Sequence, residues 1–180
     1  MRNDHMRCRQ RKHAVAFSED EFENIYRTWA PALFNFTARL VGRQEARDLV
    51  QETFLRLFRT PVPPDRVKPW LYRVAYRLCI DHHRRKKAAP AHPVSELPEP
   101  GDPGANPETV YLAREAIARF LAAFRNLPPE GRALLLLREK DNASYREIAA
   151  ITGITVEAVR SRLYRARAAL HRALAIEEAK

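Results

Sequence analysis

Apolar residues near the start of the chain recur at the spacing of an amphipathic helix. Ser18 and Glu21 form a capping box, a pair in which each side chain bonds the other residue's backbone N–H at a helix start. The apolar positions that follow, at steps of three or four, are Phe22, Ile25, Trp29, Leu33, Phe36 and Leu40. This spacing predicts a helix, which we expect to bend or break near Pro31 and to end at Gly42.

Helical patterns continue on both sides of a central gap. A second helix is expected over about residues 43–59, ending before Thr60-Pro61 because proline disfavours helical backbone in the residue that precedes it. A third is expected over about residues 67–87, with an inner stripe of Val67, Leu71, Val74 and Leu78. Two more, over about residues 108–125 and 130–140, open the second half. No segment has the pattern of a strand, so we predict an all-α fold.

Residues 88–108, AAPAHPVSELPEPGDPGANPE, interrupt the helical patterns. They contain six of the 13 prolines and four acidic residues but no lysine or arginine, so neither helix nor sheet is expected there. The segment therefore predicts an acidic, flexible linker between two small helical domains. The expected divisions are a basic tail (1–17), a first helical domain (18–87), the linker (88–108) and a second helical domain (109–176).

The strongest local pattern in the second half predicts a helix-turn-helix. Ser144 and Glu147 form another capping box, and Gly153 permits a sharp left-handed turn after it. Thr155 can then cap the next helix through its side-chain oxygen. Between the caps, the residues expected to face inward are Ile148, Ala149 and Ile151. Two helices joined by such a turn are typical of DNA-binding proteins.

The helix after this turn separates an apolar stripe from a basic face. The stripe consists of Val156, Val159, Leu163, Ala166, Leu170 and Leu174. The opposite faces carry Arg160, Ser161, Tyr164, Arg165 and Arg167. Arginine can pair bidentately with guanine in the major groove or with phosphates, so we interpret this surface as DNA-binding. The alternative is a solvated face that only stabilises the helix electrostatically, and the preceding turn with its caps argues against it.

The overall charge also indicates an anionic partner. The 180-residue chain carries a formal net charge of +10 and has a sequence pI near 10.1, which favours nucleic acid or an anionic membrane surface. No apolar run approaches the roughly 20 residues that cross a bilayer. We therefore expect no membrane insertion and a cytoplasmic location.

Patterns of catalytic or metal-binding residues are missing from the sequence. Cys8 and Cys79 are too few for a disulfide framework. Two groups could be considered as metal ligands, and neither has a recognised zinc spacing: His5 with Cys8 and His13, and Cys79 with His82 and His83. The sequence also has no glycine-rich phosphate loop and no clustered carboxylates or activated nucleophile. We expect no cofactor, no metal and no enzymatic activity.

Three segments together resemble one protein family. LPPEGRALLLLREKDNASYREIAAITGITVEAVRSRLYRARAALHRAL resembles region 4 of the extracytoplasmic-function (ECF) sigma factors, which belong to the sigma-70 family of RNA polymerase initiation factors. In the first half, ARDLVQETFLRLF resembles region 2.2 of this family, and WLYRVAYRLCIDHHRRKK resembles regions 2.3 to 2.4. The three matches occur in the family's order on the two sides of the linker, so together they are stronger evidence than any one of them alone.

This resemblance implies roles for two surfaces. Region 4 would read the promoter minus-thirty-five element, and the residues in its DNA-facing positions are Thr155, Arg160, Ser161, Tyr164 and Arg165. The second helix carries a polar stripe on one face, made by Asp48, Gln51, Glu52 and Leu55. The resemblance implies that this stripe binds the clamp helices of the largest polymerase subunit. Without the resemblance, a solvated helix face would be the simpler interpretation.

Basic and aromatic side chains are combined along the third helix. Aromatic rings can stack with the bases of single-stranded DNA while cations hold its backbone. The resemblance implies that the melted minus-ten strand is captured here, by Arg73, Tyr76, Arg77, Arg84, Arg85 and Lys86. Trp70 fits a core position better, as aromatic residues at helical spacing usually do. Arg77 stands where many family members have asparagine.

The function implied by the resemblance is that of a sigma factor. Such a protein binds core RNA polymerase, through the clamp helices and the beta flap, and directs promoter-specific transcription initiation. Promoter DNA and an anti-sigma factor are its other expected partners. A polymerase-independent helix-turn-helix regulator is the alternative, and the stripe on the second helix argues against it. An enzyme that acts on nucleic acid would need a catalytic constellation that the sequence does not contain.

Overall fold

The computed structural model describes residues 17–86 and 107–178, which form helices joined by short turns and loops. The predicted all-α fold is confirmed for these residues. The elements are α1 (Glu19–Val41), α2 (Arg43–Phe58), the 3-10 turn η1 (Pro64–Arg66), α3 (Val67–Lys86), α4 (Pro107–Arg125), α5 (Pro129–Glu139), α6 (Tyr145–Thr152) and α7 (Val156–Glu178). Nearly all of the predicted basic tail and linker, residues 1–16 and 87–106, lies outside the described residues.

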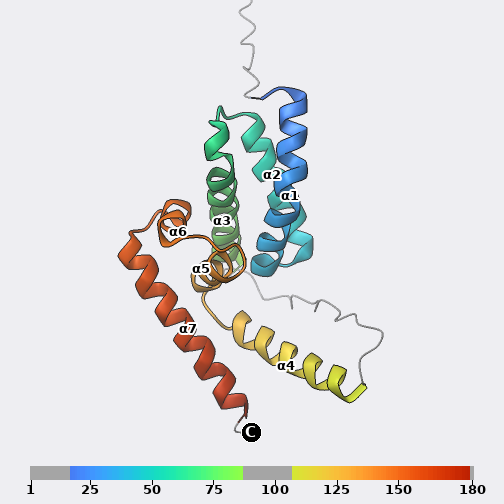
Figure 1. The fold of residues 1–180 in the computed structure, drawn as a ribbon, viewed down its shortest axis with the longest axis vertical. Helices are drawn as coiled ribbons and strands as arrows, with labels where there is room; N and C mark the ends of the chain where they lie inside the picture. Colours follow the sequence, from blue (N-terminus) through green and yellow to red (C-terminus); the bar gives the residue numbers. More distant parts are fainter. Residues whose placement is uncertain (1–16, 87–106, 179–180) are drawn as a thin grey trace, which may run out of the picture.

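Helices α1, α2 and α3 pack side by side as one unit (Figure 1). Each contributes a fully buried leucine to its core, Leu33, Leu57 and Leu71. As predicted, α1 ends at Gly42, which has a φ of 102°. Of the bend or break predicted near Pro31, the break is wrong, because α1 continues through this residue. Pro31 is exposed, so the carbonyl that it leaves without a donor lies on the side where water can bond it.

Both predicted capping boxes are formed. The Ser18 amide donates to the Glu21 carboxylate at 2.8 Å, and the Glu21 amide donates to Ser18 Oγ at 3.2 Å. Ser144 and Glu147 repeat the arrangement at 2.7 and 3.2 Å. These bonds favour the charged carboxylate, so they lower the pKa of both glutamates. The starts of α1 and α6 are therefore fixed by local sequence.

Helices α5, α6 and α7 form the predicted helix-turn-helix unit, and α4 packs against α7. In the turn after α6, Gly153 adopts the left-handed conformation with φ 76° and ψ 24°. Thr155 caps α7, because its Oγ1 accepts a hydrogen bond from the Ala158 amide at 3.2 Å. The residues that fill the centre of the core, all completely buried, are Leu134, Leu137, Ile148, Val159 and Leu163. The predicted inner stripe of the last helix is thus confirmed at its centre.

The two helical units pack against each other. Helix α6 lies against α3, and α5 contacts both α1 and α3 (Figure 1). The buried apolar residues of both units form one continuous cluster, in which Tyr72 of α3 and Leu137 of α5 take part. This packing was not expected from the sequence, where the linker suggests two independent domains.

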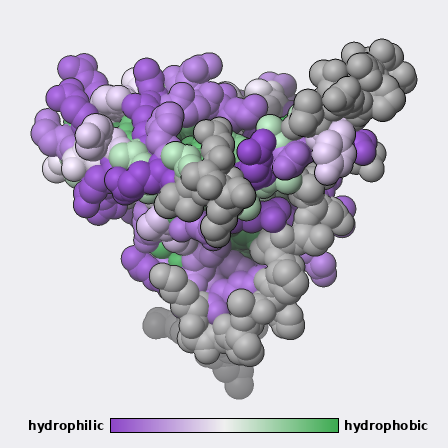
Figure 2. Space-filling model, turned by 90° about the horizontal axis from the view of Figure 1, so that it is seen from below, coloured by the Kyte–Doolittle hydropathy of each residue, from purple (hydrophilic) through white to green (hydrophobic). Residues whose placement is uncertain are grey.

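Hydrophilic side chains dominate the surface at the end of the molecule where α4 and α7 lie. Figure 2 shows this end from below, with hydrophobic side chains exposed only in small patches. The helices within residues 17–86 and 107–178 include none that is long and apolar enough to span a membrane.

Candidate nucleic-acid interface

The outer face of α7 presents the residues that were predicted to contact duplex DNA. Arg160, Ser161, Tyr164 and Arg165 are all exposed, and Tyr164 is 74% exposed. Their spacing places them on one helix face, one turn apart. Thr155 lies at the start of the same helix, where its hydroxyl already caps the backbone. The structure therefore brings the five predicted residues together at and near the N-terminal half of α7.

An open hollow of about 450 Å³ adjoins this face. Its lining residues are Arg138, Ser144, Tyr145, Arg146, Val156 and Arg160. The first turns of α6 and α7 both border the hollow, and helix N-termini attract phosphate through their free N–H groups and dipoles. Three arginines and two helix starts thus form a surface suited to the phosphate backbone beside the base-reading face.

Two members of this hollow, Arg138 and Arg146, were missed by the sequence reasoning. The Arg138 guanidinium lies over the Tyr145 ring, 5.3 Å from its centroid, and its Nη1 donates to the Ala143 carbonyl at 3.1 Å. Arg146 is exposed on the first turn of α6. Both precede α7 in sequence, and neither belongs to a periodic pattern of basic residues. Only their positions, in the last turn of α5 and the first turn of α6, could have indicated them.

The predicted minus-ten residues of α3 differ in how exposed they are. Arg73 and Arg77 are exposed, whereas Tyr76 is only 7% exposed. Arg73 Nε donates to the Ala150 carbonyl oxygen of α6 at 2.9 Å. In this arrangement neither the Tyr76 ring nor the Arg73 Nε group is free to meet a DNA strand.

The C-terminal end of α3 carries the other predicted cations. Arg84 Nη1 lies 3.8 Å from the Asp81 carboxylate, and Arg85 Nε donates to the Asp81 carbonyl at 3.4 Å. Both arginines are exposed. Lys86 is partly buried and its Nζ lies 3.1 Å from the carboxylate of Glu45 on α2. Lys86 therefore also links two helices of its own unit.

Helix α2 presents the predicted polymerase-binding stripe to solvent. Asp48, Gln51 and Leu55 are exposed, and Leu55 is 43% exposed despite its apolar side chain. Glu52 is partly buried and pairs with Arg56 at 2.7 Å. The opposite face of the helix fills the core through Val50, Phe54 and Leu57. The stripe has one acidic group and one amide that are free for a partner, beside an apolar side chain.

Two exposed aromatic residues extend this apolar surface and were missed by the sequence reasoning. Phe58 is 43% exposed and Tyr26 is 47% exposed. The Phe58 ring packs edge-on against Phe22 at 5.5 Å between centroids, and the Tyr26 ring lies 4.8 Å from Phe54. Neither residue was given a role from the sequence. The structure leaves them half-covered near α2, as anchor residues of protein interfaces often are.

The cysteine that had been considered as a metal ligand is enclosed by the core. Cys79 is completely buried, and burial raises the pKa of its thiol to about 12. Among the described residues, no three side chains of ligand type gather in a group that could hold a metal ion. The N-terminal candidates His5, Cys8 and His13 lie outside the described residues.

Comparison with known proteins matches each helical unit to a family. The family model described as Sigma-70 region 2 matches residues 25–89, and the family model described as Sigma-70, region 4 matches residues 117–170. ECF RNA polymerase sigma factor SigE of Mycolicibacterium smegmatis is 35% identical over 161 residues, covering 86% of this chain and 62% of that protein. The chain therefore spans less than two thirds of this relative. RNA polymerase sigma factor CarQ of Myxococcus xanthus is 31% identical, covering 82% of this chain and 86% of that protein.

Solved structures share the fold. The sigma factor RpoE in complex with the anti-sigma factor NepR, from Bartonella quintana, has a TM-score of 0.64 at 22% identity, covering 87% of this chain and 98% of that one. CnrH in complex with the cytosolic domain of CnrY has a TM-score of 0.64 at 24% identity, covering 88% and 90%. At these identities the likeness concerns the arrangement of the helices only.

Proposed function

The chain belongs to the ECF sigma factors of the sigma-70 family, and we propose that it is a non-catalytic initiation factor that brings core RNA polymerase to promoters. The observation that carries this proposal is the presence, in one chain, of an exposed acidic and apolar stripe on α2 and an exposed basic face on α7. A polymerase-independent regulator needs only the second surface. An acidic stripe is a poor surface for DNA and a suitable one for a basic protein partner.

The proposed role of the helix-turn-helix unit is to read the minus-thirty-five duplex. Arg160, Ser161, Tyr164 and Arg165 would meet base edges and the adjacent backbone in the major groove. Arg138 and Arg146, in the neighbouring hollow, would hold phosphates and fix the orientation of α7. These contacts require no movement within the unit, since every one of these side chains is at least partly exposed.

The proposed role of the first unit is to dock on polymerase and to capture the minus-ten strand. Asp48 and Gln51 would bond to the clamp helices, while Leu55 and the half-exposed rings of Tyr26 and Phe58 would be covered by them. The basic side of α3 would hold the displaced strand through the residues Arg73, Tyr76, Arg77, Arg84, Arg85 and Lys86. Binding energy within the holoenzyme would then drive strand opening.

We also infer an anti-sigma factor as a partner. Two of the structural neighbours are complexes with anti-sigma factors, NepR and the cytosolic domain of CnrY. The predicted contact with the beta flap of polymerase belongs to the same proposal. A sigma factor works on chromosomal promoters with core polymerase, so the proposal places the protein in the cytoplasm.

The test of this function replaces two polar residues of the α2 stripe with alanine. The double variant Asp48→Ala/Gln51→Ala should weaken binding to purified core polymerase by roughly tenfold, because it removes a charged and a neutral hydrogen-bonding group from an interface. Promoter-specific transcripts should fall in parallel. Affinity can be measured by fluorescence anisotropy of the labelled chain, and transcripts by run-off assay.

The matched control is Glu23→Ala/Asn24→Ala, which removes an exposed acid and an exposed amide from α1. This control should bind core polymerase and support transcription as the unmodified chain does. Binding of Asp48→Ala/Gln51→Ala that equals the control would show that the docking surface lies elsewhere. Tight binding of the unmodified chain to duplex promoter DNA, with no effect of core polymerase, would favour the polymerase-independent regulator.

A further inference from the structure

An ion pair joins the end of α5 to the middle of α7. Arg167 Nη2 donates to Glu139 Oε1 at 2.5 Å, although the two side chains are 44% and 56% exposed. Glu139 is the last residue of α5. The bond to Glu139, and after it the contact with Tyr145, raise the pKa of Arg167 against the opposing effect of burial. Arg167 therefore stays charged while its guanidinium is held at the end of α5.

Tyr145, the first residue of α6, connects this pair with the hollow beside α7. The Arg138 guanidinium lies over the Tyr145 ring, 5.3 Å from its centroid, and both residues line the hollow. Tyr145 also acts on Arg167, whose charged form it favours. Two arginines of the helix-turn-helix unit thus share one tyrosine. Arg138 borders the surface suited to phosphates, whereas Arg167 is bonded to a carboxylate.

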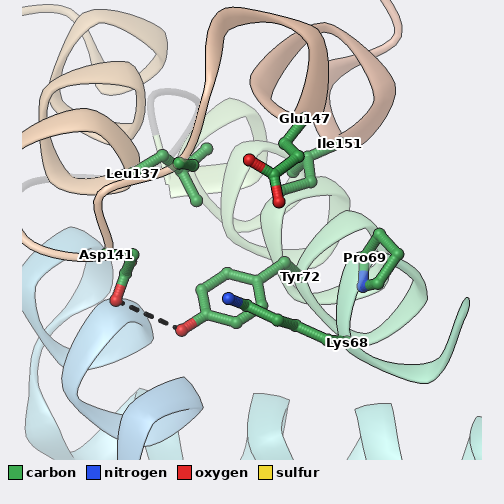
Figure 3. A pocket seen from close by; sticks show the side chains of 8 residues that line it. Lys68, Pro69, Tyr72, Leu137, Asp141, Glu147 and Ile151 are labelled. Atoms are coloured by element: carbon green, nitrogen blue, oxygen red, sulfur yellow. Dashed lines mark hydrogen bonds between the residues drawn. The ribbon is translucent and has the colours of Figure 1, made fainter. Parts of the chain in front are cut away.

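The other acidic groups beside the turn between α5 and α6 have different partners. The Asp141 carboxylate is directed at the Tyr72 hydroxyl, which donates to it at 3.2 Å (Figure 3). The Glu147 carboxylate accepts the backbone amide of Ser144 at 2.7 Å. Neither carboxylate is therefore available to replace Glu139 as the partner of Arg167.

Arg167 continues the row of residues that was predicted to face DNA. Arg160, Tyr164 and Arg167 are spaced by four and three residues, so they lie along one face of α7. In a helix-turn-helix, the N-terminal residues of the second helix contact base edges. Arg167 lies about 10 Å further along α7 than Arg160, at 1.5 Å per residue, and so lies toward the phosphate backbone. A guanidinium in that position binds phosphate whatever the base sequence.

We propose that Glu139 is a positioning residue that limits sequence-independent DNA binding, because it holds Arg167 at the end of α5 and away from the phosphates. Phosphate contacts strengthen binding to every duplex, and a genome offers a large excess of nonspecific sites. Holding one cation back leaves the contact with DNA to the predicted base-reading residues, Arg160, Ser161, Tyr164 and Arg165. This inference rests on the proposed function of α7 and adds a residue of α5 to it.

The experiment measures the affinity of the full chain for a short mixed-sequence duplex at several salt concentrations, by fluorescence anisotropy of the labelled DNA. Each phosphate that a protein neutralises adds about 0.9 to the slope of log affinity against log salt concentration. Glu139→Gln keeps the size of the side chain but removes its charge, so it frees Arg167. The slope should steepen by about 0.9. Because exposed ion pairs are weak, the affinity at low salt should rise only by roughly fivefold.

Matched variants separate this effect from a change in net charge or in folding. Glu23→Gln makes the same charge change and also frees an exposed arginine, Arg27, but on α1, so the slope should stay as it is. Glu139→Gln with Arg167→Ala removes the freed guanidinium and should restore the slope of the unmodified chain. Arg160→Ala removes a predicted DNA contact and should weaken binding. Circular dichroism of each variant checks that the helices are intact.

Two results would overturn the proposal. One is a slope for Glu139→Gln that equals the slope for Glu23→Gln, which would reduce the ion pair to a contact between helices. The other is a steepened slope that persists when Arg167→Ala is added, because another cation would then be responsible. Arg160→Ala that binds the duplex as the unmodified chain does would instead contradict the DNA-binding role of α7. None of these measurements uses polymerase, so the role of Glu139 and the core-binding test of the α2 stripe can fail separately.

Discussion

At the scale of single residues, His83 combines burial with an adjacent cation at the boundary between the units. Its Nε2 lies 2.8 Å from the Leu40 carbonyl oxygen and 3.2 Å from Arg132 Nη2. A carbonyl only accepts, so Nε2 must carry the proton that is donated to Leu40, and it then cannot accept one from Arg132. Burial first, and also the charges of Arg132 and His82, lower the pKa of His83, against the opposing effects of the Leu40 bond and Glu130.

This environment predicts that the packed structure loses stability as the pH falls below about 6.5. A histidine whose pKa is lowered by packing binds its proton more tightly in the unpacked chain, where the pKa is near 6.5. Its contribution is therefore complete above about pH 6.5 and is lost as the pH falls toward the lowered value. Denaturant unfolding at several pH values should show a decline that is smaller in His83→Gln, which keeps a donor for Leu40.

The decline should be reduced in His83→Gln rather than abolished, because burial lowers the pKa of His82 as well. The shifted carboxyl groups have pH dependences of their own. Asp141, with its raised pKa, favours packing at lower pH, whereas Glu21 and Glu147 contribute stability that is lost only below about pH 4.5. An identical pH dependence in His83→Gln and the unmodified chain would contradict the role given to this residue.

Sequence reasoning at this scale succeeded where exposure follows from local pattern. Arg160 and Tyr164 are exposed as expected, because their positions on an amphipathic helix decide which side they occupy. Tyr76 could not be placed in the same way. It is only 7% exposed, and charges from the second unit, Glu130 and Arg162, influence its pKa. No local spacing encodes relations between segments so far apart.

At the scale of elements, Gly153 decides whether α6 and α7 can meet at the required angle. Its φ of 76° lies in the left-handed region, and a Cβ placed there would meet nothing within 4 Å. Gly153→Ala should therefore lower the free energy of unfolding by roughly 1–2 kcal/mol through backbone strain alone. Gly153→Asn should cost less, because asparagine tolerates this conformation. Thermal denaturation of both variants followed by circular dichroism provides the comparison.

Equal stability of the alanine and asparagine variants would contradict the strain argument, since the two differ chiefly in their tolerance of positive φ. Caps and turns of this kind were the most predictable elements. The Ser18 and Ser144 boxes were read from residues only three positions apart. The break expected at Pro31 failed because proline's effect depends on what surrounds the freed carbonyl, and exposure is a property of the packed helix.

At the scale of the whole molecule, the arrangement of the two units is the feature that sequence patterns could not supply. The proline-rich linker indicated two units, and both were found with the expected helices. Their contact depends on pairs such as Tyr72 with Asp141, which are 69 residues apart. The α2 stripe and the α7 face are largely exposed in this arrangement, whereas Tyr76 on α3 is not.

The central claim is that this chain gives core RNA polymerase its promoter specificity, and transcription of genomic DNA fragments by purified core enzyme tests it most directly. With the chain present, new transcripts should begin at discrete sites preceded by shared minus-ten and minus-thirty-five sequences. Without it, those sites should be silent. Active core enzyme that gains no discrete start sites from the chain would contradict the account.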